Sequence, residues 1–289
     1  MAVVVNADPS AKTTHALQIL AAELNWQLVE VPACPGLARQ RNLGIATALD
    51  LDPYVDLVHF IDDDVLVSES YFVEISRAFG AAPGAVAIGG RDVTTSPVRT
   101  TRIGLALGTH SRHEGSLLRS GYNTGFKSVS GLRKVEWLSG CSQSFRMTRL
   151  QDVRYDPLIR FYGEEVDMFT RCSERGEILF CADAKFQHLF ADEGRQDASD
   201  EAFWGDCARW DLCRKYPKRF NRGFLILATL THMMAMLLSW AIARTPRRLS
   251  AASGHARFLL RVLSGTVPRD EAIRCEDPSG ARGLPIVHL

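Results

Sequence analysis

Three consecutive acids, Asp62, Asp63 and Asp64, are the residues of this sequence that most clearly indicate chemistry. They directly follow the apolar run 55–61, which is typical of a buried parallel strand. Ligands of open α/β sheets bind at the carboxyl ends of strands, and clustered carboxylates are costly unless a cation neutralises them. Asp62 and Asp64 therefore predict a divalent cation, Mg²⁺ or Mn²⁺, that also binds a nucleotide diphosphate. The alternative is a solvated turn that caps a helix over 68–78.

A second acidic group, Glu164, Glu165 and Asp167, begins a helix predicted over 164–175. A carboxylate held above a bound sugar could take the proton from an incoming hydroxyl. Acids also favour a helix N-terminus through the helix dipole, so a capping role is the alternative.

Two further segments carry candidate ligands. Gly36 precedes a helix over 37–49 that contains Arg41 and Asn42. The N-terminal amides of this helix and Arg41 are suited to a pyrophosphate or a base, although a surface arginine after a glycine turn is the alternative. His188 follows a strand-like segment and is either a metal ligand, a phosphate contact or a structural histidine.

Strands and helices are predicted to alternate through the first ninety residues, which favours an α/β fold with a mostly parallel, doubly wound sheet flanked by helices. After an unassigned insertion over 91–136, a strand near 145, the helix over 164–175 and a strand over 178–181 follow. The strands of the first part are 2–5, 27–31, 55–61 and 85–88, and its helices are 12–24, 37–49 and 68–78.

Bulk properties restrict the class of protein. A chain of 289 residues can form one large α/β domain with an appendage, and its 46% hydrophobic and 23% charged residues exclude wholesale disorder. The net charge of +1 predicts no nucleic-acid partner. The 7 cysteines form no CxxC pair, so reduced thiols in the cytoplasm are expected.

The segment from Gly223 to Ala243 carries no formal charge and is bracketed by basic residues. Its length permits a membrane span, while the flanking charges suit a helix lying in an anionic membrane surface. Packing on the catalytic body or at a dimer contact is the third alternative. A second amphipathic helix is expected over 252–263, and a loosely ordered end beyond 266.

Taken together, the segments over roughly 2–189 resemble the family-two glycosyltransferases of the GT-A fold, of the bacterial cell-envelope polysaccharide type. The resemblance implies a nucleotide-diphosphate sugar donor, a glycan or lipid-linked acceptor, and a place at the inner face of the cell membrane. The matching segments, in order, are Val3-Val4-Val5, Gly36 with Arg41-Asn42-Leu43-Gly44, Phe60 to Val65, Gly89-Gly90, Gly140-Cys141-Ser142, Gly163 to Asp167, and His188.

Position by position, Asp62 and Asp64 correspond to the first and last acids of the D-x-D motif. The resemblance implies that Asp64 binds the metal, that Asp62 lies against the sugar nucleotide, and that His188 helps to hold the metal and diphosphate. Asp63 is a further candidate donor contact, as are Arg41, Asn42 and Gly140.

Glu165 stands where the family has the second acid of Glu-Asp, the catalytic base. Glutamate is one methylene longer than the usual aspartate, so Glu164 and Asp167 are the alternatives. Trp137 and Cys141 are expected to line the acceptor side of the cleft, with a buried core tryptophan as the alternative for Trp137.

Two departures from the family pattern concern the N-terminus. The family fold has one more strand before the strand at 2–5, so either the start codon is placed too late or the first strand is missing. The acidic turn reads Asn6-Ala7-Asp8 where two adjacent acids are usual, which makes Asp8 the candidate for the base contact. The predicted units are the GT-A domain 1–200, the helical tail 201–265 and the C-terminus 266–289.

The sequence thus predicts a metal-dependent, inverting glycosyltransferase. A nucleotidyltransferase that makes the activated sugar is one rival, but no glycine-rich basic loop precedes Lys12. A non-catalytic relic that still binds a nucleotide sugar is the other.

Overall fold

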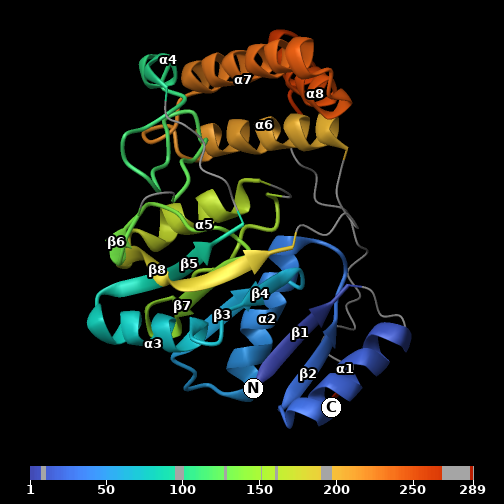
Figure 1. Cartoon of the computed structure of the whole chain (residues 1–289), viewed down its shortest axis with the longest axis vertical. Coiled ribbons are helices and arrows are strands. Elements are labelled where there is room, and N and C mark those ends of the chain that lie inside the picture. The colour runs from blue at the N-terminus through green and yellow to red at the C-terminus, as the bar shows by residue number, and fades with distance from the viewer. Residues whose placement is uncertain are drawn as a thin grey trace.

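The chain folds into an α/β body with a layer of helices stacked on one side of it (Figure 1). The computed structural model describes residues 1–7, 11–94, 101–126, 129–150, 152–159, 162–189, 197–268 and 287–288.

The N-terminal strands form a small sheet of their own. Strand β1 (Ala2–Asn6) pairs in parallel with β2 (Leu28–Pro32), and helix α1 (Ala11–Leu24) connects them. A short strand near the C-terminus, β9 (Val287–His288), pairs antiparallel with β2. This small sheet therefore contains strands from near both ends of the chain.

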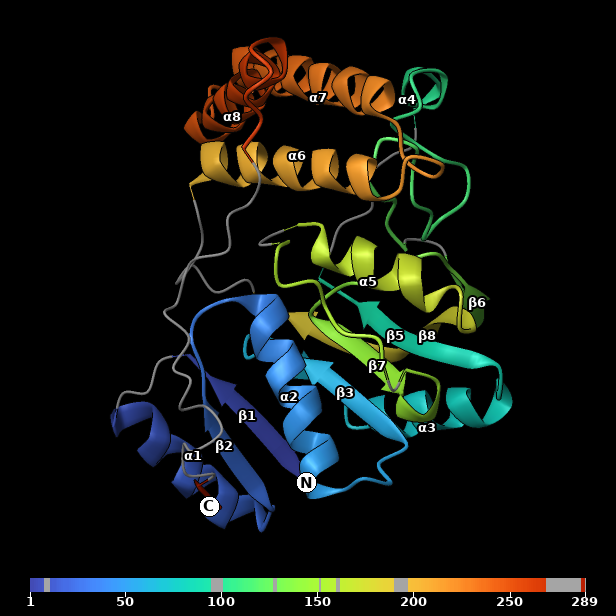
Figure 2. The same cartoon turned by 180° about the vertical axis from the view of Figure 1, so that it is seen from behind.

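A six-stranded sheet forms the centre of the body. Its main path is β3-β7-β5-β8-β4, and β6 (Leu132–Lys134) pairs with β8. Strand β7 is antiparallel to both β3 and β5, and β5 is parallel to β8, so β3, β5 and β8 run in one direction. Figure 2 shows β1 running the same way beside them. The bounds of the path strands are β3 (Leu57–Ile61), β4 (Val65–Val67), β5 (Ala85–Asp92), β7 (Ser142–Arg146) and β8 (Glu177–His188).

Helices cover both faces of this sheet because alternate strand residues point to opposite sides. Ile178 and Phe180 of β8 pack in a cluster with α2 (Leu37–Leu51) and α5 (Glu164–Cys172). Leu179 and Cys181, which alternate with them, pack on the other face with α3 (Tyr71–Ala81). The predicted α/β class, with helices on both faces of a central sheet and a helical tail, is confirmed. The central sheet is mixed, because β5–β8 is its one parallel pairing among the described strands.

The tail consists of α6 (Ala198–Lys215), α7 (Arg222–Ala243) and α8 (Pro246–Leu263). Val166 of α5 shares a buried cluster with Phe203, Leu212 and Phe258, so the tail is docked on the body. Its helix starts have clear local causes. Asp197 caps α6, Asn221 accepts hydrogen bonds from two N–H groups of α7, and Pro246 begins α8.

The helix and strand expectations hold to within a few residues. Strand β8 is much longer than the predicted 178–181, because it pairs with β5, β4 and β6 along its length. The unassigned 91–136 region contains α4 (Arg102–Ala106) and β6. Within the described residues, α7 alone is long and apolar enough to cross a membrane, with a mean hydropathy of 1.8.

Candidate functional site

Arg41 lies at the centre of the candidate site. Its side chain is 5% exposed, and Nη2 donates a hydrogen bond to the Gly140 carbonyl at 3.0 Å. The same guanidinium lies 3.4 Å from Glu164 Oε1 and 3.7 Å from Asp62 Oδ1. One side chain therefore joins α2, the end of β3, the turn before β7 and the start of α5, so the surface alternative for Arg41 is wrong.

Tyr155 supports Arg41 and had no sequence signal of its own. The Arg41 guanidinium lies over the Tyr155 ring, 5.2 Å from its centroid. Asn42 donates to the Tyr155 carbonyl and accepts from the Tyr155 N–H, both at 2.8 Å. The Asn42 side-chain amide both donates to and accepts from the Tyr155 backbone, so it holds α2 against this segment. The side chain therefore does not point toward the predicted donor.

The carboxylate of Glu165 lies against the Gly140 backbone. A Cβ at residue 140 would collide with this carboxylate and would lie 2.7 Å from Arg41 Nη2, so only glycine fits. Burial, and then the neighbouring Glu164 carboxylate, raise the pKa of Glu165 to about 8, although Arg41 and the Gly140 N–H oppose that rise. A carboxyl group with a raised pKa beside a positioned arginine is suited to proton transfer.

The acidic triplet divides into three different environments. Burial raises the pKa of Asp62 despite the nearby Arg41, and the Asp64 carboxylate adds to that rise. Asp63 is exposed. The first acid thus lies against Arg41, and the second faces solvent.

Asp64 and His188 are brought together by strand pairing. Val65 of β4 is in register with His188 of β8, and His188 Nε2 lies 3.0 Å and 3.1 Å from the two Asp64 oxygens. Within the described ranges, no cluster of three or more metal-ligating side chains is present. A carboxylate and an imidazole nevertheless fit Mn²⁺ or Mg²⁺, since such ions take their other ligands from substrate phosphates and water.

Asp167 points away from this cluster. It is fully buried and accepts hydrogen bonds from Arg171 and from the Tyr216 hydroxyl, each at 2.7 Å. Lys215 Nζ lies 2.6 Å from Asp167 Oδ1, the same oxygen that accepts the hydrogen bond from Tyr216. Asp167 therefore fastens α5 to the end of α6, and the structure does not bring it together with Glu165 as an alternative base.

The two residues predicted to contact the acceptor, Trp137 and Cys141, make other contacts in the structure. Trp137 donates to the Thr124 carbonyl at 2.8 Å and packs against Phe126, which favours the core alternative. The Cys141 thiol is buried, and burial raises its pKa to about 12. The backbone of Cys141 does reach the site, because its carbonyl accepts the Asp62 N–H. Asp8 lies outside the described residues.

Comparisons with known proteins leave the family open. No protein-family model matches the chain, and no curated protein matches its sequence. Among solved structures, A197 from STIV aligns with a TM-score of 0.43 and 16% identity, over 66% of this chain and 85% of that one. The mannosyltransferase PcManGT from Pyrobaculum calidifontis, in complex with GDP-Man and Mn²⁺, aligns with a TM-score of 0.48 and 14% identity, over 93% of this chain and 75% of that one.

Proposed function

We propose that this chain is a metal-dependent, inverting glycosyltransferase that uses a nucleotide-diphosphate sugar donor. The single observation that carries the proposal is the convergence of Asp62, Glu164 and Glu165 on Arg41 and Gly140. These residues come from four separate segments, and Asp64, which pairs with His188, lies two residues after Asp62.

The charge balance of the cluster supports a cation. Asp62 and Glu164 outnumber the single guanidinium of Arg41, and ionisation of Glu165 adds a further negative charge, so an anionic diphosphate would meet net repulsion there. A cation on Asp64 and His188 would reverse that repulsion. Mg²⁺ or Mn²⁺ would supply a bridge to the donor diphosphate and offset the charge on the departing nucleotide diphosphate.

Different residues of the chain then have separate roles in the transfer of the sugar. Glu165 accepts the proton of an acceptor hydroxyl as that oxygen attacks the anomeric carbon. The bond between this carbon and the diphosphate oxygen breaks, and its electron pair leaves with the nucleotide diphosphate. Arg41 and Gly140 fix the position of the Glu165 carboxylate during this single displacement, which inverts the configuration. The acceptor is proposed to be a glycan or a lipid-linked glycan.

Attachment to an anionic membrane surface is part of the proposal. The exposed face of α7 is apolar over its whole length, with exposures that rise from 37% at Leu227 to 86% at Ile242. Its ends carry Arg222, Arg244 and, at the start of α8, Arg247 and Arg248. An apolar stripe between cationic ends is complementary to a bilayer surface rich in anionic lipid.

Product analysis of donor breakdown tests the proposed reaction. The full chain is incubated with Mn²⁺ and a panel of nucleotide-diphosphate sugars. Release of nucleoside diphosphate supports glycosyl transfer or its hydrolytic side reaction. Release of pyrophosphate from a sugar phosphate and nucleoside triphosphate would instead support a nucleotidyltransferase, and no turnover of any donor would support a binding relic.

A further inference from the structure

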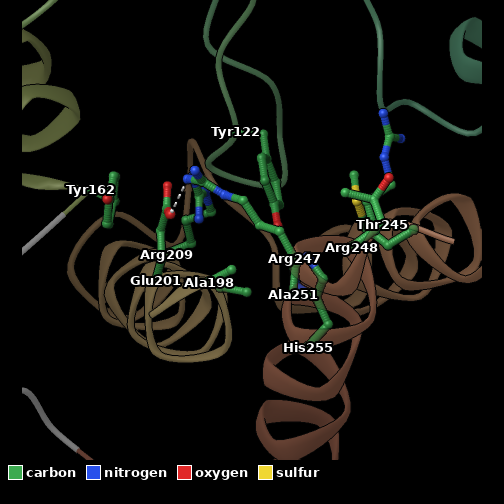
Figure 3. Close-up of a pocket in the computed structure, with 12 residues that line it drawn as sticks. Tyr122, Tyr162, Ala198, Glu201, Arg209, Thr245, Arg247, Arg248, Ala251 and His255 are labelled. Carbon is green, nitrogen blue, oxygen red and sulfur yellow. Dashed lines mark hydrogen bonds and ion pairs between the residues drawn. The ribbon is translucent and has the colours of Figure 1, made fainter. Parts of the chain in front are cut away.

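A cavity of about 480 Å³ lies between α6, α7 and α8, away from the acidic cluster. Figure 3 shows its labelled residues converging from α6, from α8 and from the loop that carries Tyr122. Tyr162, just before the start of α5, also lines it. We call this space the arginine cavity, because Arg209, Arg247 and Arg248 line it, while Glu201 is the one acidic lining residue among those that the structure describes.

Arg209 is held in the cavity wall with little hydrogen bonding. Its side chain is 16% exposed, and its guanidinium lies over the Tyr122 ring, 3.8 Å from the centroid. The nearest acid, Asp206, is 3.9 Å away. Both Asp206 oxygens are already used, since Tyr122 donates to one at 2.6 Å and His255 Nδ1 lies 2.7 Å from the other.

The guanidinium of Arg209 is therefore a positioned but incompletely paired cation. Within the described part of the chain, its buried Nε has no hydrogen-bond partner. Gly205 leaves room for the side chain, because a Cβ there would lie 2.9 Å from Arg209 Nη1. A buried donor without a partner is costly, and an anion in the cavity would compensate the charge of this incompletely paired guanidinium.

The other two arginines lie on α8, opposite α6. Arg247 contacts Glu201 at 3.4 Å, as the dashed line in Figure 3 marks. Arg248 donates to the Ser239 hydroxyl of α7 and has no acidic partner among the described residues. The positive charge of the cavity thus exceeds its negative charge, and both α8 side chains are accessible from solvent.

We propose that the arginine cavity binds a phosphate-bearing ligand, at a site distinct from the acidic cluster. Guanidinium groups present paired N–H donors that match phosphate oxygens, and Arg209, Arg247 and Arg248 all contribute to the lining of this cavity. A volume of this size also accommodates more than a bare phosphate ion, so an organic phosphate ester fits it. The ester is either a soluble phosphate or the headgroup of an anionic lipid.

Calorimetric titration with inorganic pyrophosphate and with a water-soluble short-chain phosphatidic acid tests this site. The full chain is kept in a chelator, so that a divalent cation cannot carry a diphosphate to Asp64. We expect binding of at least one probe, weakened at least tenfold in Arg248→Gln and in Arg209→Gln. Tighter binding of pyrophosphate identifies a soluble source, whereas tighter binding of the phosphatidic acid identifies a lipid headgroup.

The matched control is Arg77→Gln, which removes an exposed arginine of α3 and should bind both probes as the wild type does. Arg248 is exposed, so its variant keeps the test valid even if Arg209→Gln does not fold. The proposal is overturned if neither probe binds. It is also overturned if Arg77→Gln weakens binding as much as Arg248→Gln, because the binding is then a general charge effect.

Discussion

The Glu165 carboxylate is seated directly against Gly140, on the same glycine whose carbonyl accepts a hydrogen bond from Arg41. The turn before β7 therefore contacts both the proposed base and the arginine beside it. The same turn carries the carbonyl that accepts the Asp62 N–H. One short backbone segment thus contacts both the proposed base and the proposed donor-binding residues.

Gly140→Ala tests that relationship. The added methyl group would overlap the Glu165 carboxylate and crowd Arg41, so we expect turnover to fall roughly hundredfold through misplacement of the base. Overpacking should lower the free energy of unfolding by only about 1–3 kcal/mol. The matched control is Gly125→Ala, where a Cβ meets nothing within 4 Å. Equal activity of both variants would show that the tight packing has no catalytic role.

Glu165→Gln tests the proton acceptor through pH dependence. The base must be ionised, and the pKa of Glu165 is raised, so wild-type turnover should increase as the pH rises through about 8. The variant should lose at least about a hundredfold in turnover and this pH dependence, while donor affinity stays within a few fold. Full activity of Glu165→Gln, together with an inactive Asp167→Asn, would place the base elsewhere.

Asp167→Asn should act on stability instead. Removal of the charge leaves Lys215 and Arg171 without their buried partner. We expect a loss of about 2–3 kcal/mol in the free energy of unfolding, less than for a fully buried pair because both cations remain partly solvated. Denaturant unfolding measures the loss. Specific activity of the folded variant should stay near that of the wild type, and a stable but inactive variant would contradict this assignment.

The sequence predicted the parts of the fold that local patterns encode. Strand–helix alternation through Ile88 and the acids after β3 follow from residue periodicity, and the structure confirms both. His188 and Asp64 are residue types that bind metal ions, so each was recognisable from the sequence as a candidate metal ligand. The family resemblance implied that both residues lie at one metal site, but residue types and periodicity alone do not predict their contact, because it depends on the β4–β8 register between segments more than a hundred residues apart.

The remaining differences between the predicted and the observed site depend on which side chains are buried and which partners they contact. Arg41 was expected to contact a pyrophosphate or a base, with a surface arginine as the alternative, and the structure instead shows three segments closing over it. Asp167 shares the start of α5 with Glu165, yet the docking of α6 takes it out of the site. The arginine cavity had no local signal, because its lining residues come from five separate segments of the chain.

Leu238→Glu and Ile242→Glu test membrane attachment. Both side chains lie on the exposed stripe of α7, and a charge there opposes burial in a bilayer. Co-sedimentation with vesicles of anionic lipid should fall at least about tenfold for each variant, as expected for losing one buried apolar side chain. Val73→Glu, on exposed α3, is the control and should bind as the wild type does. Vesicle binding that is unaffected in both α7 variants would contradict attachment through this face.

Calorimetry of a nucleoside diphosphate with Mn²⁺, on wild type and Asp64→Ala, tests the central claim most directly. The wild type should bind the diphosphate with Mn²⁺ and lose that binding in a chelator, because Asp64 and His188 are the proposed ligands. Asp64→Ala should lack the metal-dependent binding while its melting temperature stays near that of the wild type, and the exposed control Asp183→Ala should bind normally. Unchanged metal-dependent affinity in Asp64→Ala would contradict the account.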